Sequence, residues 1–330
     1  MITRWQNKLL DTLWREHRRL PLSAAHKVYK LLARRNRIPD DTFTQPFYGL
    51  HYEGKLTNNV DAAIYFLGAF EKPLLHFMED TLRALAPAQG VFVDVGANVG
   101  QHSLFMSRIA AQVIAFEPYE PVRLRLLHQI KLNSISNIEV HATGLSDSSR
   151  TLPFYAPVGS NAGIGSFDPE STKKGNIAIG ELAIVSGDEH FEQHRPARLD
   201  MLKIDVEGFE RSVLQGLKKT LQIYRPLVTC EMTYGNADSF KTSEDIINNL
   251  PENYTLLCFD RRRADGRKRQ RDNARARFSG LYRLMPYPGP LVSGQDDVIL
   301  CPQELLGKIP FTNNKNSTFG ISFLTIVSFR

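Results

Sequence analysis

The sequence predicts a doubly wound α/β fold built on a mostly parallel sheet. Between residues 91 and 232, short apolar stretches alternate with stretches whose apolar residues recur at helical spacing. This alternation is typical of parallel strands that are covered by helices on both faces. Two further apolar stretches, 254–260 and 297–303, have no helical pattern between them, so we expect them to pair antiparallel.

The expected elements follow in order along the chain. Residues 2–37 have a basic, helical pattern, and Trp5, Leu9, Leu13 and Trp14 fall roughly on one side of it. A linker at 37–49 and a helix at 61–86 come next. The remaining elements are strands at 91–96, 112–118, 138–146, 201–208, 226–232, 254–260 and 297–303, an extra strand at 151–157, helices at 100–110, 120–133 and 210–221, and a Gly- and Ser-rich loop at 158–176.

These elements divide the chain into three parts. Residues 1–70 are expected to form a helical N-terminal extension, and residues 71–304 the seven-stranded α/β domain. An Arg-rich stretch at 261–290 is a basic insertion in that domain, and residues 305–330 form a C-terminal tail.

Composition excludes several classes of protein. The 330 residues are 42% hydrophobic, which is enough for a sizeable core, but no apolar run is long enough to span a membrane. The first twenty residues lack the apolar centre of a signal peptide, so we expect a cytoplasmic enzyme. Cys230, Cys258 and Cys301 lie far apart in apolar runs, which indicates buried thiols. The net charge of +6 is concentrated in two basic runs.

A glycine-rich turn follows the first predicted strand of the domain. It contains Asp94, Gly96, Asn98 and Gly100, residues that suit a sharp turn with close backbone approach to a ligand. A dinucleotide fingerprint needs Gly-x-Gly-x-x-Gly, but here Asn98 and Gln101 occupy the second and third glycine positions. The turn therefore does not favour a dinucleotide.

Carboxylates follow the other predicted strands. Glu117 ends the second strand, where it could bind a ribose diol, and Asp147 follows the third. Asp205, Glu207 and Glu231 end the next two strands. A single such acid is usually a helix cap or a surface charge. Together they would repel a pyrophosphate and attract a cationic ligand, which favours S-adenosylmethionine.

The motifs resemble those of the FkbM family of class I S-adenosylmethionine-dependent methyltransferases, which have a Rossmann-like sheet. The likeness covers about residues 91–235, with a weaker likeness in "DVILCP". It rests on "DVGANVG" (94–100), "FEP" (116–118), Asn133, "NAG" (161–163), "LDMLKIDVEGFERSVLQG" (199–216) and "PLVTCEM" (226–232). The resemblance implies methylation of a hydroxyl group, often on a sugar or natural product.

The resemblance also implies roles for residues at the cofactor. The turn residues would surround the methionine end of S-adenosylmethionine, and Glu117 would hold the ribose hydroxyls. Ser146 and Asp147 would lie near the adenine. We therefore expect the cofactor-binding residues Asp94, Gly96, Asn98, Gly100, Glu117, Ser146 and Asp147.

Three acids are the candidate catalytic residues. Strand periodicity places Lys203, Asp205 and Glu207 on one face of their strand. We expect Asp205 beside the sulfonium and the acceptor hydroxyl, with Glu207 or Glu231 completing the pocket.

Alternatives remain for each of these residues. Lys203 could form a purely structural pair with Asp205 or Glu207. Asp205, Glu207 and Glu231 could hold Mg²⁺, although our main interpretation assigns no metal ligand. His102 could reach the site, but an ordinary position on a helix face is the simpler interpretation.

The interpretation is thus a methyltransferase acting on a glycan or glycosylated small molecule. One alternative is an RNA methyltransferase that uses the Arg-rich insertion, although nucleic acid is not the expected partner because few aromatic residues lie nearby. A nicotinamide-dependent oxidoreductase is a second, and a non-enzymatic membrane-surface protein a third. Contact of residues 1–37 with the inner face of a membrane stays open, as does packing of this helix on the domain.

Overall fold

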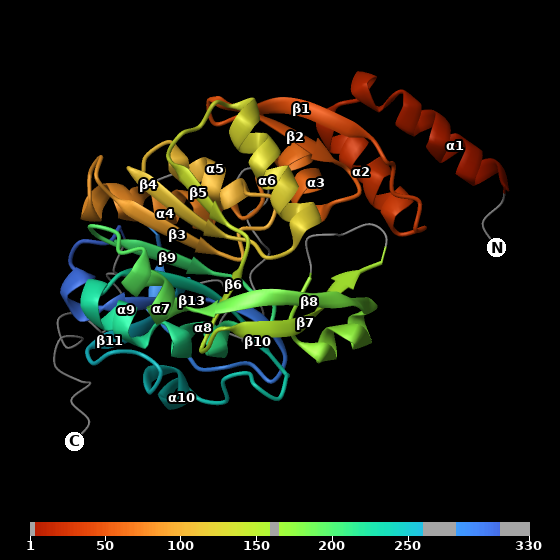
Figure 1. Cartoon of the computed structure of the whole chain (residues 1–330). Helices are drawn as coiled ribbons and strands as arrows, with labels where there is room; N and C mark the ends of the chain where they lie inside the picture. Colours follow the sequence, from red (N-terminus) through yellow and green to blue (C-terminus); the bar gives the residue numbers. More distant parts are fainter. Residues whose placement is uncertain (1–3, 159–164, 260–281, 311–330) are drawn as a thin grey trace.

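The computed structural model describes residues 4–158, 165–259 and 282–310 and has one central sheet (Figure 1). Among the described residues, its strands have the order β12-β11-β13-β10-β9-β3-β4-β5. The strands are β3 (Val91–Val95), β4 (Gln112–Phe116), β5 (Ile138–His141), β9 (Met201–Ile204), β10 (Leu227–Tyr234), β11 (Tyr254–Phe259), β12 (Leu284–Pro286) and β13 (Gly294–Pro302).

The strand directions confirm the doubly wound, mostly parallel sheet. β5, β4, β3, β9 and β10 run parallel to one another. β13 lies between β10 and β11 and is antiparallel to both, so the predicted antiparallel closing pair is confirmed. The short β12 adds an eighth strand to the seven that were expected.

Helices cover both faces of this sheet (Figure 1). Each α-helix of this part of the chain has buried apolar residues. They are α4 (Lys72–Leu85), α5 (Gln101–Ser107), α6 (Glu120–Leu132), α7 (Gly187–Gln193), α8 (Glu210–Gly216), α9 (Lys218–Tyr224) and α10 (Ser243–Ile247), with the 3₁₀ turn η3 (Gln303–Leu305).

Neighbouring residues of the central strands point into two different cores. In β3, Val93 and Val95 join the core that contains apolar residues of α7, α8, α9 and α10. Phe92 points the other way, into the core shared with α4, α5 and the N-terminal segment. Burial on both faces explains why this strand is a continuous apolar run, interrupted only by Asp94.

The N-terminal segment packs on one of these cores. Trp14 is buried and donates to Asp41, and Leu13 is partly buried, whereas Trp5 and Leu9 are exposed. The four apolar residues therefore do not share one environment. The segment comprises α1 (Arg4–Arg15), η1 (His17–Arg19), α2 (Leu22–Ala33), β1 (Thr42–Phe47), β2 (Leu50–Lys55) and α3 (Asn59–Leu67).

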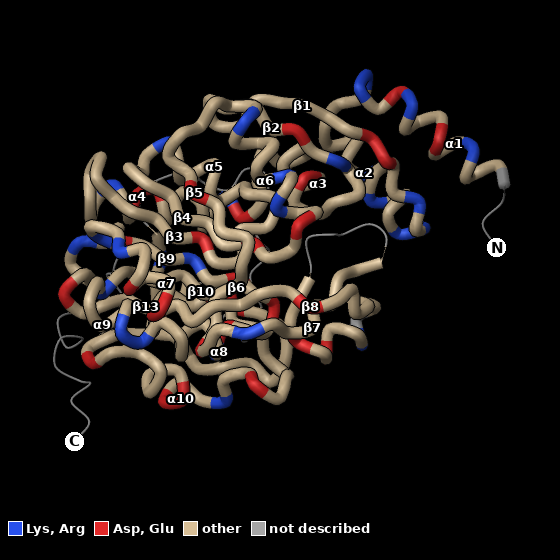
Figure 2. Tube along the Cα trace, viewed as in Figure 1, with Lys and Arg blue, Asp and Glu red and all other residues tan. Residues whose placement is uncertain are grey.

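Both signs of charge occur along this segment. Figure 2 shows acidic and basic residues along α1. Arg37 pairs with Asp11, and Arg19 pairs with Glu16, at 2.7 and 2.8 Å. These are exposed pairs, which contribute little to stability.

The predicted linker at 37–49 is wrong, because most of it belongs to a hairpin. β1 pairs antiparallel with β2 through the turn at Tyr48 and Gly49, both of which have positive φ. Pro46 suggests a loop in the sequence, but a two-stranded sheet has only edge strands, where proline is tolerated. Phe47 and Tyr52 bury one face of the hairpin and so fix it.

The hairpin is also held from the domain side. Asn133 accepts from the backbone N–H of His51 and donates to its carbonyl, and Gln129 of α6 accepts from the backbone N–H of Glu53. The hydrogen bonds of Asn133, a residue of the family motif, are thus structural.

Three other boundaries differ from the prediction. The helix expected at 61–86 is two helices, because Gly68 ends α3 in the left-handed conformation with φ 84°. The strand expected at 138–146 divides into β5 and β6 (Gly144–Ser146), which lie in different sheets. The extra strand at 151–157 is confirmed as β7 (Arg150–Pro157).

A second sheet continues from the end of the Gly- and Ser-rich loop expected at 158–176. β8 (Asn176–Ser186) pairs parallel with β6 and antiparallel with β7, and η2 (Pro169–Lys174) precedes it. This region is therefore only partly a loop. The β-branched residues Ile177, Ile179, Ile184 and Val185 are the sequence feature that indicates the strand.

Several predicted segments lie outside the described residues. These are 261–281 of the basic insertion, 311–330 of the tail and the motif at 161–163. Within the described part of the chain, no helix is both long and apolar enough to span a lipid bilayer.

Candidate cofactor pocket and active site

One pocket lies at the carboxyl ends of β3, β4 and β9. Five of the predicted site residues line it, namely Gly96, Asn98, Glu117, Asp205 and Glu207. Because β3 is paired with β4 on one side and β9 on the other, the acids that end these strands meet at one edge of the sheet. This is the edge where open α/β sheets bind ligands.

The glycine turn forms part of the pocket lining. Gly96 and Gly100 have φ of 80° and 88°, and Asn98 between them has φ of 53°. The backbone N–H groups of Gly96 and Ala97 donate to the carbonyl of Phe116, which fixes the turn to the end of β4. Gly100 does not line the pocket; its Cα faces Leu126 of α6.

Glu117 is the acid most tightly integrated with the turn. One carboxylate oxygen accepts from the backbone N–H of Asn98, and the other accepts from that of Tyr119, both at 2.9 Å. Burial raises the pKa of Glu117 to about 7, although these two hydrogen bonds oppose the rise. Each oxygen can accept a further bond from a ligand hydroxyl.

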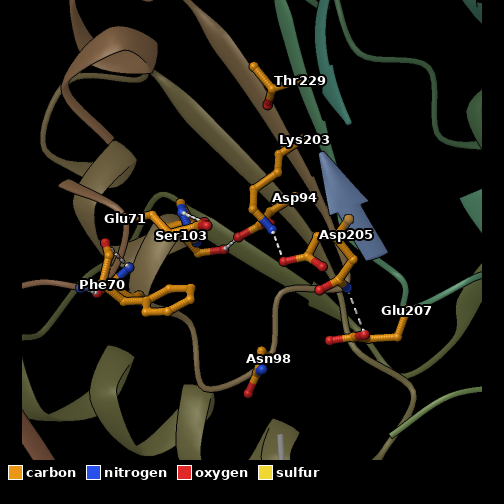
Figure 3. Close-up of polar contacts among 12 residues, drawn as sticks. Phe70, Glu71, Asp94, Asn98, Ser103, Lys203, Asp205, Glu207 and Thr229 are labelled. Carbon is orange, nitrogen blue, oxygen red and sulfur yellow. Dashed lines mark hydrogen bonds and ion pairs between the residues drawn. The ribbon is translucent and has the colours of Figure 1, made fainter. Parts of the chain in front are cut away.

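Lys203 joins two of the predicted acids (Figure 3). Its Nζ is 3.0 Å from Asp205 Oδ2 and 3.8 Å from Asp94 Oδ1, and all but 4% of the lysine side chain is buried. Burial alone would lower the pKa of Lys203, but the charges of Asp205 and Asp94 outweigh it and raise this pKa. The structure therefore contains the Lys203–Asp205 pair that the sequence left as an alternative.

Asp94 is not among the residues that line the pocket. It is fully buried in β3, and Ser103 of α5 donates to its Oδ2 at 2.6 Å. Burial raises the pKa of Asp94, against the opposing effect of Lys203. Asp94 therefore binds Ser103 through a hydrogen bond and lies beside the charge of Lys203.

Glu207 and Glu231 have different surroundings. Glu207 has a positive φ of 51° and lines the pocket, and Gln295 of β13 donates to its carboxylate at 3.0 Å. Glu231, on β10, is not among the lining residues. Burial and then the nearby charge of Asp205, to which it is also hydrogen-bonded, raise the pKa of Glu231 well above its usual range.

Two residues expected near the adenine point elsewhere. Ser146 is buried and donates to Asp147. Asp147 is partly exposed and pairs with Arg150 at 3.1 Å. Neither lines the pocket, although the two preceding residues, Gly144 and Leu145, do. The roles assigned to Ser146 and Asp147 stay predictions.

Sequence reasoning missed an aromatic wall of the pocket. The rings of Tyr119, Phe154, Phe167 and Phe209 follow one another with centroid separations of 5.0–5.6 Å, and all four residues line the pocket. They come from four separate segments, so no local pattern joins them. Tyr119 and Phe209 had a sequence signal, because each lies two residues after a predicted site acid.

His102 is buried in the first turn of α5, so it is not an ordinary surface histidine. Its Nε2 has no hydrogen-bond partner and lies 3.8 Å from the carboxylate of Glu71. Burial lowers the pKa of His102 well below its usual value, and so does Lys203.

Residues 94–256 match the family model described as "Methyltransferase FkbM domain". These residues form an FkbM methyltransferase domain. The cofactor of the FkbM domain is S-adenosylmethionine, as the acids at the strand ends indicated. The match begins at Asp94 and ends within β11, so it covers the glycine turn, Glu117, Asp205 and Glu231.

Two relatives of known name are similar to this chain over part of their length. "Methyltransferase 1" of Beauveria bassiana is 29% identical over 148 residues, which cover 40% of this chain and 59% of the relative. The "Hexuronic acid methyltransferase AglP" of Haloferax volcanii is 31% identical over 148 residues, which cover 44% of this chain and 58% of the relative. The match thus spans about three fifths of either relative.

Proposed function

We propose that this chain transfers the methyl group of S-adenosylmethionine to a hydroxyl oxygen of a glycan or glycosylated small molecule. The observation that carries the proposal is the pocket itself, in which the glycine turn, Glu117 and Asp205 meet beside the aromatic wall. This lining suits a ligand with a ribose diol, a flat base and a positive charge.

The methyl transfer requires positioning and removal of one proton. The acceptor oxygen forms a bond to the methyl carbon as the carbon–sulfur bond breaks, and S-adenosylhomocysteine leaves. The proton of the hydroxyl passes to a carboxylate. We assign this role to Asp205, which lines the pocket and keeps its geometry through Lys203. Glu207 and Glu231 complete the acceptor side.

The class of acceptor is the finer part of the proposal. Its support is the name of the Haloferax volcanii relative, which specifies a hexuronic acid. A sugar offers several hydroxyl groups, and a weak alcohol nucleophile needs both the base and an in-line approach. We therefore expect glycosides of uronic acids to be accepted before nucleic acids.

The test is calorimetric binding of S-adenosylhomocysteine to the full chain. Micromolar binding is expected, and Glu117→Ala should weaken it at least tenfold, about 1.4 kcal/mol. Glu120→Ala is the matched control, because this exposed acid lies three residues further on at the start of α6. No binding by the folded wild-type chain would overturn the cofactor assignment.

Acceptor class is then tested by turnover. Incubation with S-adenosylmethionine and a panel of uronic acid glycosides should release S-adenosylhomocysteine, and Asp205→Asn should reduce the rate by about 10²–10⁴-fold. Release with RNA and none with any glycoside would refute the glycan acceptor.

A further inference from the structure

Three carboxylates form a cluster beside Asp205. They belong to Glu71, before α4, Glu231 of β10 and Asp297 of β13. One oxygen from each lies within 4.8 Å of the other two, and all three residues are partly buried. We call this group the carboxylate cluster.

The backbone brings these acids together. Glu231 and Asp297 are direct partners in the antiparallel register of β10 and β13. Like charges directly opposite one another destabilise a pair of strands. Glu71 adds a third carboxylate from a residue with a positive φ of 48°. A bound cation would offset this repulsion.

His102 supplies an independent indication of that ligand. Its side chain is more than nine-tenths buried, and its Nε2 has no hydrogen-bond partner. The same atom lies 3.8 Å from Glu71 Oε2, so it is directed at the cluster. A buried polar atom without a partner normally indicates a missing ligand, water or ion.

The spacing suits a metal ion. Two ligands of one Mg²⁺ ion, each about 2.1 Å from it, lie no more than about 4.2 Å apart, and the limit for Ca²⁺ is about 5 Å. The oxygen separations of up to 4.8 Å already meet the limit for Ca²⁺ and need only small shifts to meet the limit for Mg²⁺. Three carboxylates are a donor set that suits Mn²⁺ or Mg²⁺.

We propose that Glu71, Glu231 and Asp297 bind one divalent cation, Mn²⁺ or Mg²⁺, beside the methyl-transfer site, with His102 next to Glu71. This set differs from Asp205, Glu207 and Glu231, the alternative that the sequence left open. Only Glu231 is common to both, because the Glu207 carboxylate is bound by Gln295 at the pocket. Within the described residues, the carboxylate cluster is the group that has metal-ligand spacing.

The role of this cation rests on the proposed function. Glu231 is hydrogen-bonded to Asp205, and Asp205 lines the cofactor pocket. A cation at the cluster would therefore be one side chain away from the reacting hydroxyl. From there its positive charge would stabilise the acceptor oxygen as this oxygen loses its proton to Asp205 and bonds to the methyl carbon that leaves sulfur.

The first measurement is a titration of the metal-free full chain with Mn²⁺. The electron paramagnetic resonance signal of free Mn²⁺ reports how much of the ion is bound. We expect one ion per chain. Glu71→Gln and Asp297→Asn should each weaken binding at least tenfold, and His102→Leu should weaken it less. Asp296→Asn is the matched control, because Asp296 is the neighbour of Asp297 and points to the opposite face of β13. It should leave Mn²⁺ affinity unchanged.

Circular dichroism shows whether each variant is folded. If either Glu71→Gln or Asp297→Asn fails to fold, the other variant still tests the site. Absence of binding at millimolar Mn²⁺, or equal affinity in wild type, Glu71→Gln and Asp297→Asn, would overturn the metal site. Calorimetry of S-adenosylhomocysteine in the presence of a chelator separates the two proposals. Cofactor binding without Mn²⁺ binding refutes only the metal site, whereas Mn²⁺ binding without cofactor binding refutes the proposed function.

Discussion

Gly96 lies against Asp205 so closely that a Cβ on the glycine would be 1.9 Å from the Asp205 carbonyl oxygen. The contact joins the end of β3 to the end of β9. It therefore places the glycine turn, which would hold the cofactor, against the residue proposed to accept the proton. No side chain fits between these two strand ends.

Gly96→Ala should destabilise the chain and abolish binding of S-adenosylhomocysteine. The alanine would be strained at φ 80° and would also displace the Asp205 backbone. Strain alone costs about 1–2 kcal/mol, and overpacking adds about 1–3 kcal/mol. Gly49→Ala isolates the strain, because Gly49 has φ 87° and open space around it. Urea denaturation should show the larger loss for Gly96→Ala, and equal losses would mean that the contact is unimportant.

Binding of S-adenosylhomocysteine at pH 7 should release protons from Glu117. The pKa of free Glu117 is about 7, raised by burial, so roughly half of the carboxyl groups carry a proton at this pH. Ribose hydroxyl groups that donate to Glu117 stabilise its charged form and lower this pKa. Calorimetry in buffers of different ionisation enthalpy should therefore detect up to about half a proton released per ligand.

The same residue should give the stability of the ligand-free chain a pH dependence. The folded pKa of about 7 lies above the ordinary 4.5, so the contribution of Glu117 is complete below pH 4.5 and is lost as pH rises to about 7. Glu117→Gln should reduce both this loss and the proton release. A variant that releases as many protons as wild type would show that another group titrates.

Lys203→Met should be strongly destabilising at neutral pH. Removing the ammonium leaves Asp94 and Asp205 without their shared partner, and breaking a buried pair costs about 3–5 kcal/mol. The exposed Lys218→Met should change the free energy of unfolding by less than about 0.5 kcal/mol. Because the folded pKa of Lys203 is raised above 10.5, its contribution is complete below that pH and lost above it. Denaturation curves that are alike for both variants would contradict this.

Phe167→Ala should weaken S-adenosylhomocysteine binding by about five- to tenfold, which corresponds to about 1–1.4 kcal/mol for a lost ring contact. Phe167 stands between Phe154 and Phe209 in the aromatic wall. Tyr155→Ala is the control, because this residue follows Phe154 but does not line the pocket. If calorimetry gives the same affinity for both variants, the adenine does not contact this wall.

Much of the fold could be predicted from local patterns. Strands buried on both faces must be continuous apolar runs, and the glycine turn and Glu117 are adjacent to such runs. The hairpin β1–β2 could not be predicted, because Pro46 and the polar residues around it have the local character of a loop. Its stability comes from Phe47 and Tyr52, which are buried against residues distant in the sequence.

By itself the sequence determined the order of strands and helices and the acids at the strand ends, since both depend on residue type and spacing along the chain. Only the tertiary structure decided which of those acids meet. It paired Lys203 with Asp205, separated Glu207 from Glu231, and brought Glu71 to Glu231 and Asp297. Those contacts depend on strand order and register, which are set by burial of two cores over the whole chain and not by any local stretch.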